Sequence, residues 1–233
     1  SRGLGDVYKR QDNPIYTRRG SQFTLSAQFT PPYSLFSKKD YKSLYESSSR
    51  ADREELYRWI EYYKIKFKSR VYTPLNNSEK YTLVLMGRAD FGLLGSYNKY
   101  KQTPFETFHV GGDGMTGSYT YATETIGLRG YDNGALTPYS DGRAYTRFSM
   151  ELHFPFLLQP SSTIYGLAFV EGGNAWTSLE NFNPFSLKRS AGVGVRIFLP
   201  MIGLMGIDWA YGFDKVQGEK GGGHFHFILG QEF

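Results

Sequence analysis

Cysteine is absent from the 233 residues, so the chain can form neither a disulfide framework nor a cysteine-based metal or redox site. It also lacks any run of 18 or more apolar residues, which excludes a helical membrane span. Charge of one sign is scarce as well: 27 Lys and Arg against 22 Asp and Glu leave a net charge of +5. This excess is too small for the basic surface of a nucleic-acid-binding protein, so we expect no nucleic-acid partner.

Aromatic side chains are abundant. The chain contains 19 Tyr, 18 Phe and 3 Trp, 17% of its residues, together with 27 Gly. This composition excludes a coiled coil and argues against a disordered chain. A chain rich in Tyr, Phe and Gly with a mean hydropathy of −0.45 is typical of an outer-membrane barrel, whose spanning strands alternate and need no continuous apolar run.

Alternation of polar and apolar side chains recurs from residue 21 to the end of the chain. It is clearest in residues 143–154, where mostly charged or polar side chains at odd positions alternate with mostly apolar ones at even positions. Segments of about ten residues are long enough for a tilted strand to cross a membrane. We expect eight strands, at about 21–29, 63–71, 81–91, 143–154, 162–172, 187–199, 203–213 and 223–233.

A soluble sandwich would also alternate, with one face in its core and the other in water. Two features favour a membrane barrel instead. The polar face carries several charges per strand, which suits a wide, wet lumen, and the apolar face ends in aromatic residues such as Trp209 and Tyr211. Short connections also alternate with long ones, at 31–60, 96–141 and 173–186. We therefore expect an all-β, antiparallel transmembrane barrel fold.

Residues 31–60 also contain a helix signal. Ser49 followed by Asp52 resembles a capping box, and apolar residues recur with helical spacing from Leu56 to Tyr63. We expect a short external helix before the second strand.

Two motifs could indicate chemistry. Residues 112–117 match G-x-G-x-x-G but lie in a long loop without a following helical period, so we interpret them as loop sequence. His224 and His226 lie on one strand face without a third ligand at a suitable spacing, which favours a lumen-facing pair over a metal site. No serine or aspartate is paired with a histidine as a hydrolase requires, so we expect no enzyme activity, no metal and no cofactor.

The first eleven residues look foreign. Their end, Asp-Val-Tyr-Lys-Arg-Gln at 6–11, resembles a translated transposon-adapter sequence of the kind that contaminates assembled reads. The alternative is a genuine basic tail. We expect residues 1–11 to be an artefact and residues 12–233 to be the C-terminal part of a longer protein.

The most informative segment is Leu128-Arg129-Gly130-Tyr131, inside the long connection 96–141. A loop too long for the barrel rim can fold back into the lumen, where a guanidinium needs anionic partners. Glu151 lies on the polar face of the next strand, and Glu171 ends the strand after that. Partial desolvation favours a planar, bidentate contact between arginine and carboxylate.

These residues resemble the C-terminal half of the BamA family of outer-membrane barrel-assembly factors, most closely the form found in Bacteroidota. Leu128–Tyr131 is similar to the family's Val-Arg-Gly-Phe/Tyr signature, with Leu128 in place of Val. The resemblance covers residues from about 14 to 233, and Glu171 stands where the family has Asp. Its other elements, in order, are Gly111-Gly112, Glu151 with Pro155, Glu171-Gly172 before Trp176, and the final Gly230-Gln231-Glu232-Phe233.

The resemblance implies a barrel of 16 strands, of which these eight would be the second half, with periplasmic domains upstream. Arg129 would reach into the lumen and pair with Glu171 and Glu151, which would lock the loop against the barrel wall. Gly130 would allow the tight loop tip, and Tyr131 would pack there.

The resemblance also implies a function. Gly230 would kink the last strand and, with Phe233, would mark a weak seam, the lateral gate through which client β-barrel proteins enter the bacterial outer membrane. The implied partners are the lipid bilayer, unfolded clients and accessory lipoproteins. The alternatives are a related translocator, either TamA-like or of the two-partner secretion type, and a passive porin-like barrel.

Overall fold

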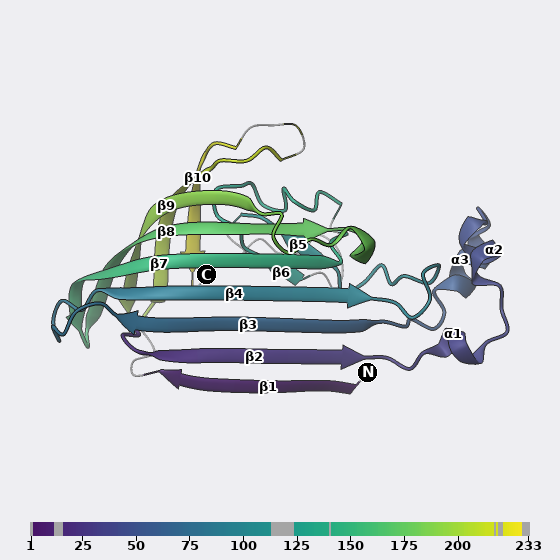
Figure 1. Ribbon diagram of the computed structural model, residues 1–233, viewed down its shortest axis with the longest axis horizontal. Helices are drawn as coiled ribbons and strands as arrows, with labels where there is room; N and C mark the ends of the chain where they lie inside the picture. Colours follow the sequence, from purple (N-terminus) through teal and green to yellow (C-terminus); the bar gives the residue numbers. More distant parts are fainter. Residues whose placement is uncertain are drawn as a thin grey trace.

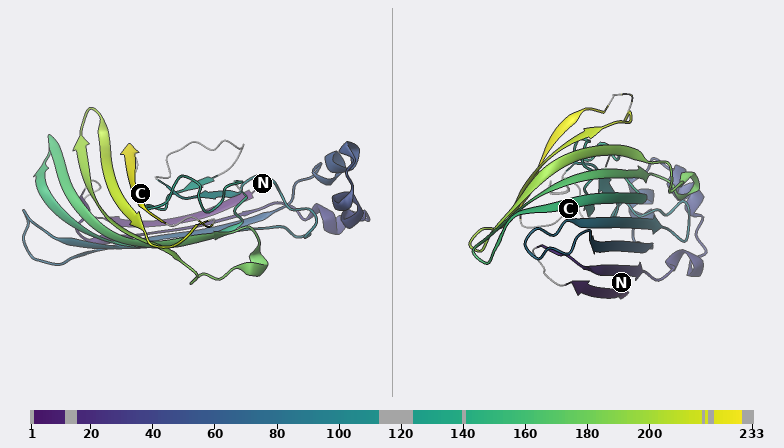
Figure 2. Two further views of the ribbon diagram at one scale, coloured as in Figure 1. Left: turned by 90° about the horizontal axis from the view of Figure 1, so that it is seen from above. Right: turned by 60° about the vertical axis from the view of Figure 1, so that its left-hand side comes forward.

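The structure is a computed structural model that describes residues 2–11, 16–112, 124–139, 141–216, 218 and 221–229. Its main element is one antiparallel sheet of nine strands in the order β1-β2-β3-β4-β7-β8-β9-β10-β11 (Figure 1). Eight of these strands follow residue 11, which confirms the predicted all-β fold and strand number. The sheet curls into an open trough, with β1 and β11 at its two edges (Figure 2).

The strands are long enough to cross the hydrocarbon of a membrane at a tilt, and β7 and β8 extend well beyond that length. Their bounds are β1 (Arg2–Gln11), β2 (Gly20–Phe29), β3 (Tyr63–Pro74), β4 (Val84–Gly95), β7 (Ala144–Gln159), β8 (Ser162–Trp176), β9 (Lys188–Leu199), β10 (Gly203–Gly212) and β11 (Gly223–Leu229).

Burial in the sheet is the reverse of that in a soluble protein. On β7, the polar side chains of Arg147, Ser149 and Glu151 are buried on the concave face, whereas Met150 on the convex face is 53% exposed. The same holds on β10, where Asp208 is buried and its neighbour Ile207 is 52% exposed. An apolar outer face with a polar interior is the arrangement that a lipid environment favours.

Short and long connections leave opposite ends of the sheet. Residues 75–83, 160–161 and 200–202 make the short turns at one end. The long connections, at the end with the helices in Figure 1, include α1 (Tyr33–Phe36), α2 (Tyr41–Glu46), α3 (Arg50–Leu56) and η1 (Leu179–Asn181). Within the described residues, no helix is long and apolar enough to cross a membrane.

The helix signal in residues 31–60 was correct at its start and wrong at its end. Ser49 is the N-cap of α3, but its side chain makes no capping hydrogen bond, so the expected capping box does not form. The helix ends at Leu56, and Tyr63 already belongs to β3. The amide of Thr30 donates to the carbonyl of Tyr62, so the chain joins the sheet before the helical spacing can continue. Helices α1 and α2 were not predicted.

The long connection between β4 and β7, residues 96–143, is called the inner loop below. It contains β5 (Phe108–Val110) and β6 (Glu124–Ile126), which pair in parallel, and it lies on the concave side of the sheet (Figure 2, left). Apolar side chains pack between the loop and the sheet: Tyr62, Leu94, Phe108, Val110, Ile126, Leu128, Tyr131 and Tyr145.

The segment predicted to be an artefact lies in the structure as β1. It pairs with β2 over its whole length, from Arg2 opposite Phe29 to Gln11 opposite Gly20. Its origin is a property of the gene, so the boundary between residues 11 and 12 stays a prediction.

Candidate functional site

Backbone contacts position the inner loop before any charged side chain contributes. Gly112 and Leu128 exchange two backbone hydrogen bonds of 3.0 Å, and Phe108 donates to the carbonyl of Gly142 at 2.8 Å. Gly112 has a φ of 76°, and a Cβ there would lie 1.6 Å from Asn133 Oδ1. Glycine is therefore required at this position, and the two hydrogen bonds with Leu128 fix the loop backbone immediately before Arg129.

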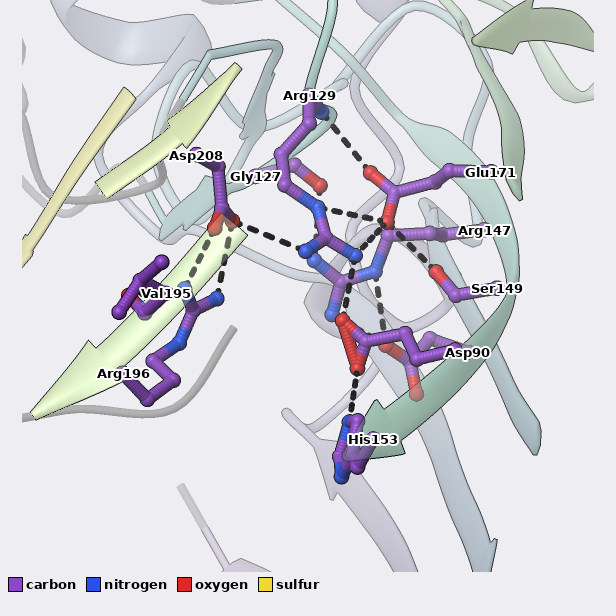
Figure 3. Close-up of polar contacts among 11 residues, drawn as sticks. Asp90, Gly127, Arg129, Arg147, Ser149, His153, Glu171, Val195, Arg196 and Asp208 are labelled. Carbon is purple, nitrogen blue, oxygen red and sulfur yellow. Dashed lines mark hydrogen bonds and ion pairs between the residues drawn. The ribbon is translucent and has the colours of Figure 1, made fainter. Parts of the chain in front are cut away.

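Arg129 is fully buried and meets three carboxylates. Its Nη2 lies 2.9 Å from Glu171 Oε2 and 2.8 Å from Glu151 Oε1, and its Nη1 lies 3.0 Å from Asp208 Oδ2 (Figure 3). The backbone N–H of Arg129 donates to Glu171 Oε1 at 2.9 Å, and the guanidinium lies 3.6 Å from the ring centroid of Phe169. One loop residue thus contacts three strands: β7, β8 and β10.

Two further arginines complete this arrangement. Arg196 of β9 donates from Nη2 to Asp208 Oδ2 at 2.9 Å, and Arg147 of β7 donates from Nε to Asp90 Oδ2 at 3.0 Å. Arg147 also donates to the loop carbonyl of Gly127 at 2.8 Å. We call the following residues the charge cluster: Asp90, Arg129, Arg147, Glu151, Glu171, Arg196 and Asp208.

The charge cluster keeps Arg129 ionised. Burial alone lowers the pKa of its guanidinium, but the carboxylates of Glu171, Glu151 and Asp208 outweigh burial and raise the pKa above its usual range. Removing one member of a buried, hydrogen-bonded ion pair typically costs about 3–5 kcal/mol, because the remaining charge is left without compensation. The cluster can therefore hold the loop firmly.

Residues 129–132 are called the tip of the inner loop below. Gly130 and Tyr131 add to the contacts that Arg129 makes with the sheet. Gly130 has a φ of 89°, and a Cβ there would lie 2.7 Å from the Cβ of Ser190. The tip therefore needs glycine for both its backbone conformation and its close approach to β9. The hydroxyl of Tyr131, a buried residue, donates to the carbonyl of Arg189 at 2.6 Å.

The part of the inner loop that carries Glu106 and Glu124 is called its stem below, and it makes ionic contacts with β3. Glu124 of β6 lies 2.9 Å from Lys66 Nζ, 3.2 Å from Lys64 Nζ and 4.0 Å from Lys68 Nζ, all on β3. Lys64 also lies 3.2 Å from Glu106. Burial raises the pKa of the Glu124 carboxyl, but the lysines outweigh burial and bring the pKa below its usual value. The loop is thus attached at two places, its stem on β3 and its tip on β7 to β11.

The two histidines of β11 both face the loop tip. His226 Nε2 accepts a hydrogen bond of 3.0 Å from the backbone N–H of Gly130. His224 Nδ1 lies 3.2 Å from Asp132 Oδ1, and the two imidazole rings are stacked 6.2 Å apart. The last described strand is therefore in direct contact with the tip.

The structure brings together Arg129, Glu151 and Glu171, and their assignment as a loop lock stays a proposal. Asp208 was missed. Its only sequence signal is a single charge in an otherwise apolar strand. Its partner Arg196 lies on the neighbouring strand, and its partner in the loop, Arg129, is 79 residues away. No local pattern indicates such a contact, although the period-two alternation does place Asp208 on the inner face.

Two expectations fall outside the described residues. Gly230 and Phe233, proposed for the gate, both do so, as does the G-x-G-x-x-G match beyond Gly112. Among the side chains that the structure does describe, no group of three or more His, Asp or Glu residues is placed to hold a metal ion.

Comparisons with known proteins cover almost the whole chain. Residues 3–233 match a family model described as "Omp85 superfamily domain". The fold is similar to that in the crystal structure of BamA from Haemophilus ducreyi lacking POTRA domains 1–3, with a TM-score of 0.66 and 19% sequence identity. The match covers 97% of this chain and 41% of the BamA chain, so the chain spans about two fifths of the length of that relative.

Proposed function

We propose, from the premise that the chain belongs to the Omp85 superfamily of bacterial outer-membrane barrels, that its function is the assembly of other barrel proteins. In this proposal the complete protein folds client β-barrels and inserts them into the outer membrane through a lateral gate. Its partners are the lipid bilayer, unfolded clients and accessory lipoproteins.

The physical basis of this activity is the cost of unpaired backbone groups in lipid. Each unsatisfied N–H or C=O group in hydrocarbon costs several kcal/mol, so an unfolded strand cannot enter the membrane alone. A strand edge that opens at a weak seam offers those groups hydrogen-bond partners and lowers the barrier to insertion. We assign the seam to Gly230 and Phe233. The mechanism needs no nucleotide, cofactor or reactive residue.

The observation that carries the proposal is the position of Arg129. In this proposal the buried Arg129 restrains the wall, because it joins a folded-back loop to three of its strands. An assembly protein needs its wall held in a defined arc while one seam stays weak. The tip contacts of Arg129 supply that restraint next to β10 and β11.

The proposal is tested with the complete protein reconstituted in liposomes. We expect it to accelerate the folding of a urea-unfolded outer-membrane barrel relative to empty liposomes and to liposomes that contain a passive porin. Ion conductance with solute selectivity and no acceleration of folding would support the porin-like alternative instead.

A related translocator, either TamA-like or of the two-partner secretion type, is the nearest alternative, because the superfamily match alone does not separate it from an assembly factor. The upstream domains distinguish the two. Reading the source DNA across residue 12 gives their number and type. Tandem POTRA-type domains followed by eight more alternating strands would support the assembly factor and identify residues 1–11 as an artefact. The number of these domains would separate it from the related translocators.

A further inference from the structure

The histidine pair of β11 has no role in the loop lock described above, yet both rings contact the loop tip. Gly130 contacts His226, and Asp132 contacts His224. Gly130 and Asp132 are two residues apart, as are His224 and His226, and the earlier loop residue contacts the later histidine. The tip therefore runs antiparallel to the inner face of β11 and meets two successive inward-facing positions of that strand.

We propose that His226 and His224 are positioning residues that hold the loop tip on β11, so that this strand cannot leave β10 without breaking contacts to the loop. His226 supplies the acceptor for the Gly130 amide, and His224 places Nδ1 3.2 Å from the carboxylate of Asp132. The inference deepens the proposed function, because β11 borders the proposed seam.

The contact to His226 is the stronger of the two, because it is buried. Both the His226 side chain and the tip lie inside the trough, where a backbone N–H without an acceptor is costly. The contact to His224 lies at the rim, since Asp132 is largely exposed. We therefore assign most of the positioning effect to His226.

The geometry determines the protonation state of the His226 ring. An imidazole nitrogen accepts a hydrogen bond only when it carries no proton, and the doubly protonated ring has no acceptor. We therefore expect His226 to be neutral with its proton on Nδ1. Its Nε2 ¹⁵N signal, assigned by its absence from the His226→Gln variant, should be that of an unprotonated nitrogen. A protonated Nε2 in the unmodified protein would overturn the inference without any variant that could fail to fold.

The main experiment measures hydrogen exchange of the Gly130 amide in the complete protein in lipid nanodiscs. Labelling with ¹³C-carbonyl Arg and ¹⁵N-Gly selects Arg–Gly pairs, of which this chain has three. Gly130→Ala assigns the signal by removing it. We expect His226→Leu to speed exchange on the order of tenfold, because the leucine offers no acceptor.

Two variants make the result specific. In His226→Gln the side-chain carbonyl can still accept, so we expect exchange within about twofold of the unmodified protein. Phe225→Leu changes a neighbouring side chain that points out of the trough, and we expect no change in exchange. Equal exchange rates in His226→Leu and in the unmodified protein would overturn the inference.

The liposome assay keeps the two proposals separate. If the unmodified protein does not accelerate client folding, the proposed function fails, whereas the exchange data still decide whether His226 holds the tip. If client folding is accelerated but exchange does not respond to His226→Leu, only the inference about the histidine pair fails.

Discussion

Arg129 is neutralised by three carboxylates on three strands, an arrangement that suits arginine better than lysine. A guanidinium can donate to Glu171 and Asp208 from different nitrogens at the same time, whereas a lysine ammonium is a single point charge on a flexible stem. Asp208 keeps its second partner, Arg196, when Arg129 is removed, but Glu151 and Glu171 then lose their guanidinium partner. A protein with Arg129→Lys should therefore keep only part of the contacts that Arg129 makes.

Gly130→Ala should weaken the docking of the tip by more than backbone strain alone would. Alanine at a φ of 89° costs about 1–2 kcal/mol in backbone strain, and the overlap with Ser190 adds about 1–3 kcal/mol. Gly203→Ala is the matched control, because Gly203 has a φ of 93° and open space around it. We expect the protease sensitivity of the inner loop to rise in Gly130→Ala only. Equal sensitivity in the two variants would contradict the close approach to β9.

The predictability of single residues from the sequence depends on how local their signal is. Arg129, Glu151 and Glu171 could be proposed because they stand in recognisable sequence settings, and the structure places them together. The contacts of Asp208 with Arg129 and of His226 with Gly130 could not, because these partners are 79 and 96 residues apart and only the folded sheet brings them together. Side-chain alternation assigns such residues to a face but gives no partner.

The stem and the tip of the inner loop differ in their exposure to water. The tip pairs of Arg129 are fully buried, whereas Glu124 and Lys66 each keep about a quarter of their side-chain surface exposed. Salt screens exposed ion pairs much more than buried ones. The stem should therefore detach from β3 under conditions that leave the tip in place.

Glu124→Gln should release the stem while the Arg129 contacts persist. Spin labels on β6 and β3 of the complete protein should report a longer and broader distance in the variant, and in the unmodified protein at high salt. Glu106→Gln is the matched control, since Glu106 contacts Lys64 but not Lys66. An unchanged distance in Glu124→Gln would show that apolar packing alone holds the stem.

The pH dependence of the stem has a defined sign. Because the docked pKa of Glu124 is lowered, its stabilising effect is fully present above the free glutamate pKa of about 4.3 and is lost as the pH falls through the docked value. The same pair of spin labels should show constant docking from pH 7 down to about pH 5 and progressive release in more acidic buffer. Release that begins near neutral pH would indicate that another group controls the stem.

Strands were predicted better than helices because their periodicity continues over many residues. All eight segments expected from alternation are strands, and most of their bounds differ by a few residues. The three helices in the second connection have four to seven residues each, too few for a helical period to become visible. The helix that was predicted was extended too far, because Trp59 and Tyr63 follow the same spacing while belonging to the return into the sheet.

The strands of the sheet, where their side chains are described, turn mostly apolar residues outward and many charged residues inward, and this arrangement should control insertion. Ile207→Arg places a charge in the middle of the outer face of β10 and should cost about 2–4 kcal/mol, whereas Phe213→Arg, just beyond the end of the strand, should cost about 0–1 kcal/mol. Urea titration of the complete protein in lipid vesicles measures both. Equal costs would contradict the assignment of this face to lipid.

The loop lock connects Arg129 and the inner loop to the barrel wall. Its most direct test uses cells that depend on the complete protein with Arg129→Ala and measures the level of client barrels. We predict that the variant inserts into the outer membrane but that its clients are depleted, because tip docking loses about 3–5 kcal/mol. Arg189→Ala is the control, since it removes an exposed arginine–aspartate pair and keeps the backbone acceptor of Tyr131. Normal client levels with inserted Arg129→Ala protein would contradict the account.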